Sequence, residues 1–350
     1  MMPMKLEKNS TGYLEYPLEI SVIVCHHTGS FIYKFVESVK RSFGVKYEII
    51  VVTSDDHLAV TGITGCKVFN GDQYPAAKRN AGARVSSGKY LAFFDDDVEI
   101  DPDCLLNFKN FMDLNPMCGM AYGKLYNMEH RNRFDEAGGF LTWTGFIWSR
   151  AEQNLIDVGQ YDHHETILAG KSASCMIRED LFFETGGFDE EFGILGEETD
   201  LSWRVWLAGL RVCFVPESVG YHAFNTKFKP AKDYYTSKRV HFNGCRNYIV
   251  MLLKNLEKGT LWRVLPLHIL IWFFAGIVML ITLKVDQGLN ILKGLIYPLK
   301  NLKQILEKRR KVQNKRVISD RELFKFIVAR PSWAYYWGRI SRYVSIGLHG

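Results

Sequence analysis

The start of the chain alternates β-rich runs with a helical pattern, and this order most constrains the fold. Residues 21–27 have the sequence SVIVCHH and residues 47–54 have YEIIVVTS, while apolar residues recur at helical spacing between residues 31 and 42. Strand, helix and strand at this spacing predict a βαβ unit with parallel strands. The continuous apolar run YLAFF at residues 90–94 predicts a further strand, buried on both faces. The fold class is therefore α/β.

The C-terminal part carries a different pattern. Residues 264–283 (VLPLHILIWFFAGIVMLITL) contain only two polar side chains, His268 and Thr282. Twenty such residues match the hydrocarbon thickness of a bilayer, although a buried core helix is an alternative. Residues 289–305 mix apolar residues with lysines, a pattern typical of a helix lying in the membrane interface. The basic stretch at residues 300–330 favours anionic lipid headgroups over nucleic acid, with a solvated tail as the alternative.

These patterns divide the 350 residues into five segments. The seven cysteines include no CxxC pair, which favours reduced thiols, and the N-terminal tail lacks the apolar core of a signal peptide. The expected segments are an N-terminal tail (1–17), an α/β domain (18–235), a juxtamembrane helix (236–260), a transmembrane or re-entrant helix (261–284) and an amphipathic basic region (285–350).

Three adjacent carboxylates follow the buried strand directly. Asp95, Asp96 and Asp97 repel one another unless a cation offsets their charge. In open α/β sheets, ligands bind at the carboxyl ends of the strands. Because side chains alternate along an extended chain, Asp95 and Asp97 should point to one side and Asp96 to the other. Two oxygen ligands on one side suit Mg²⁺ or Mn²⁺ bridging a diphosphate, while an acidic loop that caps the next helix is the alternative.

Three other features carry weaker signals when each is taken alone. A carboxylate in the EETD segment at residues 197–200 could accept a proton from a hydroxyl, but acidic residues also cap helices. The KRN segment at residues 78–80 could pair with phosphates or be a solvated helix face. His222 follows a strand, where a histidine is more often structural than a ligand.

Together, these pieces resemble the family 2 glycosyltransferases over residues 20–224. The matching elements, in the family's order, are the opening strand, RNAG at 79–82, FDDD at 94–97, GGFDE at 186–190, EETD at 197–200 and a YH pair ending at His222. The resemblance implies a GT-A fold, a Rossmann-like mixed sheet flanked by helices. It also implies that Asp95 and Asp97 hold the metal, with His222 as a further ligand, and that Glu198 is the catalytic base. The residues expected near the nucleotide sugar are Asp55, Arg79, Asn80, Asp96, Glu197, Asp200 and Arg204.

The sequence departs from the family pattern at two positions. The second strand usually ends in an aspartate that contacts the nucleoside, but Thr53 occupies that position here. Asp55 or Asp56 could substitute, which leaves nucleobase recognition open. The expected base is Glu198, where aspartate is commoner.

The resemblance implies an inverting transfer of sugar from a nucleotide-diphosphate donor to a lipid-linked or saccharide acceptor. Because nucleotide sugars are cytosolic, we expect the α/β domain on the cytoplasmic face of the cell membrane. The basic residues beyond Leu283 favour the same side, so residues 261–305 should re-enter the membrane or form a helical pair partly in the interface.

Three alternatives stay open at the sequence level. Thr53 is compatible with an inactive nucleotide-binding or scaffold protein. A nucleotidyltransferase would need a glycine-rich loop where residues 26–30 have HHTGS. A processive polysaccharide synthase would need several crossings and a QxxRW element, whereas this chain has Trp203-Arg204 in the reverse order.

Overall fold

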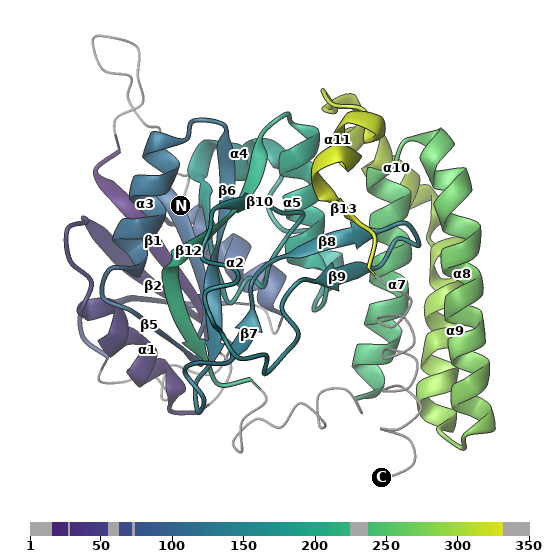
Figure 1. Cartoon of the computed structure of the whole chain (residues 1–350), viewed down its shortest axis with the longest axis horizontal. Coiled ribbons are helices and arrows are strands. Elements are labelled where there is room, and N and C mark those ends of the chain that lie inside the picture. Colours follow the sequence, from purple (N-terminus) through teal and green to yellow (C-terminus); the bar gives the residue numbers. More distant parts are fainter. Residues whose placement is uncertain (1–15, 27–28, 55–62, 72–73, 225–236, 332–350) are drawn as a thin grey trace. The chain divides into compact units, whose positions relative to one another are not determined.

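The alternating pattern at the start of the chain forms one half of a ten-stranded sheet (Figure 1). The computed structural model describes residues 16–26, 29–54, 63–71, 74–224 and 237–331. In this half, β1 pairs in parallel with both β2 and β4, and β2 pairs in parallel with β3. The elements are β1 (Leu18–His26), α1 (Phe31–Lys40), β2 (Tyr47–Thr53), β3 (Lys67–Asn70), α2 (Pro75–Arg84) and β4 (Gly88–Asp95).

The other half makes the sheet mixed. β11 runs antiparallel to both β4 and β6, whereas β12 runs parallel to β6. It follows that β4, β6 and β12 point the same way and that their carboxyl ends share one edge. The elements are β5 (Val98–Ile100), α3 (Cys104–Leu114), β6 (Cys118–Asn127), β7 (Phe134–Glu136), β10 (Glu165–Thr166), β11 (Ser174–Arg178), α4 (Glu179–Thr185), the short 3₁₀ helix η2 (Glu190–Phe192), α5 (Glu197–Leu207) and β12 (Arg211–His222).

Strand β4 is the centre of the hydrophobic core, as its composition predicts. Residues 91–94 have no exposed surface. The ring of Phe94 lies 5.6 Å from that of Phe35 on α1, while the ring of Phe93 lies 5.2 Å from that of Phe188. Because side chains alternate along a strand, these contacts cover both of its faces. The predicted two-sided burial is confirmed.

Two details differ from the sequence-based expectation. In the sequence, Pro75 is typical of a helix start and Gly88 of a helix C-cap, but α2 ends at Arg84 and Gly88 is the first residue of β4. A Cβ on Gly88 would lie 2.4 Å from the backbone nitrogen of Ser21, so close strand packing explains this glycine. The sequence of residues 121–171 has no regular pattern and predicts loops and a short hairpin, yet its first residues continue the ten-residue strand β6, whose glycines and lysine obscure the apolar pattern.

The chain divides into two compact units, and the second combines residues 139–150 and 207–209 with residues from 231 onward. Within it, α8 packs on α9, and α9 packs on α7. A three-stranded sheet of order β13-β8-β9 belongs to the same unit. Its elements are β8 (Gly139–Thr142), β9 (Ile147–Ser149), α7 (Lys238–Asn255), α8 (Lys258–Ile281), α9 (Val285–Lys300), α10 (Leu302–Asn314), α11 (Asp320–Ile327) and β13 (Val328–Ala329).

Candidate functional site

Two carboxylates and one imidazole converge at the carboxyl edge of the large sheet. Asp95 is the last residue of β4, Asp97 lies two residues further on, and His222 is the last residue of β12. One ligand atom from each side chain lies within 4.8 Å of the other two. Asp97 Oδ1 and His222 Nε2 are 3.4 Å apart, and both residues are buried. This donor set of two oxygens and one nitrogen fits a divalent cation such as Mn²⁺ or Mg²⁺.

A second carboxylate orients His222 from behind. Asp135, on β7, lies with Oδ2 2.8 Å from His222 Nδ1, and Lys171 donates to the other oxygen of Asp135 at 2.7 Å. Burial would lower the pKa of His222, but Asp97 and Asp135 outweigh it and raise that pKa to about 10. Burial would likewise raise the pKa of Asp135, yet Lys171 and His222 bring it down to about 2. Without a cation, His222 therefore carries a proton, which a metal ligand must lose.

The middle aspartate of the triplet turns the other way. Asp96 Oδ2 lies 2.8 Å from Nδ1 of His26, the last residue of β1, and both side chains are buried. Lys78 on α2 donates to the backbone oxygen of His26 and to Ser54 Oγ, so it ties the ends of β1 and β2 together. Asp96 is thus separated from its two neighbours, as the alternation of side chains predicts.

A buried arginine connects the triplet to the acidic segment of α5. Arg79 on α2 donates to Asp95 Oδ1 at 2.8 Å and to Glu197 Oε1 at 3.0 Å. It also lies 5.4 Å from the centre of the Phe188 ring. Burial lowers the pKa of Arg79, but the negative charge of Asp95 and its other neighbours outweighs this and raises it. Arg79 therefore stays charged and holds the start of α5 beside the end of β4.

Glu198, next to Glu197 in the first turn of α5, is only partly exposed. Burial, followed by the negative charge of Glu197, raises the pKa of Glu198 well above its ordinary value. A carboxylate with a raised pKa is a stronger proton acceptor once it is ionised.

Three of the polar residues expected near the donor hold the GGFDE turn. Asn80 donates to the backbone oxygen of Phe188 at 2.9 Å and accepts from its backbone nitrogen at 2.9 Å. Arg204 donates to the backbone oxygens of Thr185 and Gly187, and Asp200 accepts from Arg204 Nε at 3.0 Å. The turn needs left-handed backbone at Gly187, where φ is +64°. A Cβ on Gly187 would lie 2.8 Å from Asn80 Oδ1, so the Asn80 side chain packs closely against the turn.

The family follows from a comparison with known sequences. A model of the glycosyl transferase family group 2 matches residues 90–292, more than half of the chain. The chain belongs to this family.

Curated relatives agree over part of their length. N-acetylgalactosaminyltransferase 4 of Drosophila melanogaster is 28% identical over 167 residues, which are 43% of this chain and 24% of that enzyme. The O-antigen biosynthesis protein RfbC of Myxococcus xanthus is 30% identical over 144 residues, which are 40% of this chain and 11% of that protein. The chain thus spans less than a quarter of the length of either relative.

Solved structures show the same fold. The crystal structure of GalNAc-T7 with UDP, GalNAc and Mn²⁺ superposes with a TM-score of 0.51 and 18% identity, over 67% of this chain and 51% of that one. The crystal structure of S. aureus TarS 1-349 superposes with a TM-score of 0.51 and 18% identity, over 85% of this chain and 89% of that one. The expected GT-A-like mixed α/β fold is confirmed.

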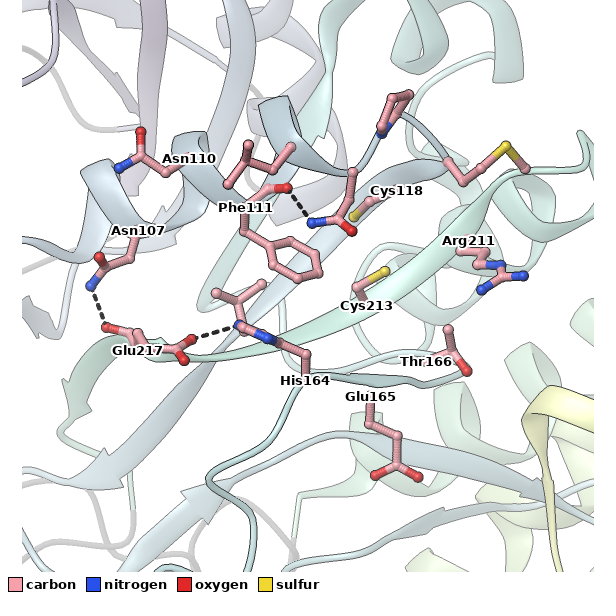
Figure 2. Close-up of a pocket in the computed structure, with 15 residues that line it drawn as sticks. Asn107, Asn110, Phe111, Cys118, His164, Glu165, Thr166, Arg211, Cys213 and Glu217 are labelled. Carbon is pink, nitrogen blue, oxygen red and sulfur yellow. Dashed lines mark hydrogen bonds and ion pairs between the residues drawn. The ribbon is translucent and has the colours of Figure 1, made fainter.

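The described part of the chain also has a cavity of 680 Å³ (Figure 2), and Asp95, Asp97 and His222 are not among the residues that line it. Cys118 and Arg211, which line it, are the first residues of β6 and β12, whereas His222 ends β12. Glu217 joins two of its walls by accepting from Asn107 and contacting His164 Nε2 at 2.9 Å (Figure 2). The cavity therefore lies near the amino ends of β6 and β12, whereas Asp95, Asp97 and His222 lie at the carboxyl edge of the sheet.

Sequence reasoning missed Asp135, Lys171 and His26, which support the site from behind. Asp135 lies in a segment that was interpreted as irregular, and no motif links it to His222, 87 residues away. Asp55, expected near the nucleoside, lies outside the described residues.

Proposed function

We propose that this family 2 protein is an inverting glycosyltransferase that moves a sugar from a nucleotide-diphosphate donor to a lipid-linked or saccharide acceptor at the membrane. The observation that carries the proposal is the cluster of Asp95, Asp97 and His222, with Arg79 joining Asp95 to the segment that bears Glu198. A metal site and a candidate base on adjoining elements are the two parts that this reaction needs.

In the proposed reaction, Glu198 takes the proton from the acceptor hydroxyl. The acceptor oxygen then forms a bond to the anomeric carbon, while the bond from that carbon to the diphosphate oxygen breaks. One displacement from the opposite side inverts the anomeric configuration. A divalent cation held by Asp95, Asp97 and His222, Mn²⁺ or Mg²⁺, would offset the negative charge on the departing diphosphate. The raised pKa of Glu198 supports its role as the base.

The remaining predicted donor contacts are proposed to act in two ways. Arg79 bonds Asp95 of the cluster and links it to Glu197, while Asp96 turns away and holds the end of β1 through His26. Asn80, Asp200 and Arg204 would act through the GGFDE turn that they hold. A uridine diphosphate sugar is the first donor to test, because the GalNAc-T7 crystal structure contains UDP, GalNAc and Mn²⁺.

The membrane setting is also a proposal. α8 is long and apolar enough to span a bilayer, and residues 285–350, which follow it, are basic. Because nucleotide sugars are cytosolic, we place the catalytic unit on the cytoplasmic face of the cell membrane.

The test is a transfer assay with a panel of nucleotide-diphosphate sugars in the presence of Mn²⁺, using lipid-linked and free saccharide acceptors. We expect transfer from one donor, loss of transfer on chelation, and a product whose anomeric configuration is opposite to that of the donor in its NMR coupling constants. A product of retained configuration would overturn the single-displacement mechanism.

A further inference from the structure

One side of α8 is apolar and exposed along almost its whole length. Trp262, Phe274 and Ile281 are 79%, 57% and 75% exposed, and other large apolar side chains fill the intervals between them. At 1.5 Å per residue, this stripe extends for roughly 28 Å. Exposed apolar surface of this extent marks a contact with a lipid or a protein.

The opposite side of α8 is fixed by polar groups inside the apolar run. His268 is fully buried, its Nδ1 donates to the backbone oxygen of Thr144 at 2.8 Å, and its Nε2 accepts from Trp272 Nε1 at 3.0 Å. Thr144 belongs to the loop that joins β8 to β9, and Phe146 of the same loop lies 4.2 Å from the His268 ring. If α8 crossed a bilayer, this loop would lie at the depth of the hydrocarbon, where irregular backbone occurs only when protein covers it, and Trp143 of the loop is 50% exposed.

The neighbouring helix adds a charge at the same depth. α9 returns along α8 (Figure 1), and a Cβ on Gly276 of α8 would lie 3.2 Å from Leu292 of α9. The next residue, Lys293, is exposed. The apolar run at residues 264–283 has its centre at Phe273 and Phe274, so Lys293 lies near the middle of any span that α8 could form. Charged side chains facing lipid at that depth are strongly disfavoured.

A helix that lies flat between protein and lipid satisfies all of these constraints. Its inner side is apolar because it packs on α9 and the β8–β9 loop, and its outer side is apolar because it faces acyl chains. The cations Arg263 on α8, Lys293 and Lys300 on α9, and Lys303 at the start of α10 are exposed and complement anionic headgroups.

We propose that α8 and the exposed side of α9 bind one leaflet of an anionic membrane with α8 in the membrane plane, so that the chain is attached without crossing. This placement gives the proposed sugar transfer a position at the lipid surface, but it does not rest on that chemistry. Vesicle binding and transfer are separate measurements, and either can fail while the other succeeds.

Binding is tested by co-sedimentation of the full chain with phosphatidylcholine vesicles, with and without phosphatidylglycerol. We expect binding that is tighter on the anionic vesicles and weaker at high salt. The double variant Phe273→Gln, Phe274→Gln should lose about tenfold or more in partitioning. Lys293→Glu should lose about fivefold on anionic vesicles only. The matched control is Leu114→Gln, whose side chain is 81% exposed on α3, and it should bind like the parent.

Orientation is tested by labelling the two ends of α8 in sealed vesicles with a membrane-impermeant maleimide. Gly259→Cys and Thr282→Cys, each in a Cys66→Ser background, place one thiol at either end, since the six other cysteines are buried. In-plane binding predicts that both thiols react without detergent. One end that is protected until detergent is added would show a crossing helix and overturn the proposal. Absence of vesicle binding, with a dimer in solution that the phenylalanine double variant dissociates, would overturn it in favour of a second copy.

Discussion

The Asp135–His222 pair gives the sharpest test of the metal site. Asp135→Asn keeps the size of the side chain but removes the charge that faces His222 Nδ1 at 2.8 Å. The Asp135 carboxylate is buried and also accepts a bond from Lys171. Water therefore has little access to His222 Nδ1 and cannot easily take over the role of the lost carboxylate oxygen. An outer carboxylate fixes the tautomer and orientation of a ligating histidine and strengthens it as a ligand.

The expected magnitude follows from this geometry. Loss of such an outer partner typically weakens metal binding by about 10–100-fold, or roughly 1.4–2.7 kcal/mol. The effect on the metal should pass through His222, because Asp135 contacts that residue and is not itself one of the three clustered side chains. Lys171 would also lose its ion-pair partner, which lowers the stability of the fold and not the affinity for the metal.

Manganese affinity is measured directly by titration calorimetry and by the electron paramagnetic resonance signal of free Mn²⁺. The matched control is Asp113→Asn, a carboxylate-to-amide change at a carboxylate bonded by Lys89 and Tyr90. We expect the control to bind Mn²⁺ like the parent. An Asp135→Asn variant that is folded and binds Mn²⁺ with unchanged affinity would refute the idea that His222 ligates the metal through this arrangement.

Three further predictions concern catalysis, the turn and acid stability. Glu198→Gln should keep donor binding and lose turnover by at least about a hundredfold; a near-normal rate would remove Glu198 from the role of base. Asn80→Ala leaves the backbone N–H and C=O of Phe188 without their side-chain partners. This variant should lower the free energy of unfolding by about 2–3 kcal/mol in a denaturant titration. An unchanged unfolding midpoint would contradict this expectation. Burial would raise the pKa of Asp113, but its bonds to Lys89, Tyr90 and Lys109 lower it to about 2. Asp113 therefore stabilises the fold at neutral pH, by about 1 kcal/mol after allowance for its exposure, and this contribution should vanish as the pH falls from about 4 to 2. Asp113→Asn should therefore be less stable than the parent at pH 7, and this difference should disappear at pH 2.

The parts of the fold that local sequence determines were predictable. The apolar strand β4 and the acids behind it identify the sheet edge, and alternation of side chains separates Asp96 from Asp95 and Asp97. Strand β6 was not predictable because Gly119, Gly123 and Lys124 interrupt its pattern. A Cβ on Gly123 would lie 2.4 Å from the Ser218 backbone oxygen on β12, so a glycine is needed here because the two strands approach closely.

The supporting parts of the site depend on contacts between distant segments. Asp135 and Lys171 are 36 residues apart, and Arg79 and Glu197 are 118 apart. No periodicity or turn rule connects such pairs, since the sheet alone brings them together. The apolar helix is a similar case, because its length and composition were evident from the sequence, whereas the contact of His268 with the β8–β9 loop was not.

The proposed function requires that Asp95, Asp97 and His222 hold a divalent cation that binds the diphosphate of a nucleotide sugar. The most direct measurement is calorimetric titration of the full chain with UDP and a panel of nucleotide-diphosphate sugars, with and without Mn²⁺. We expect heat of binding that requires both the nucleotide and Mn²⁺, and its loss in a folded Asp97→Asn variant. Absence of heat with every nucleotide, or equal heat from Asp97→Asn, would contradict it.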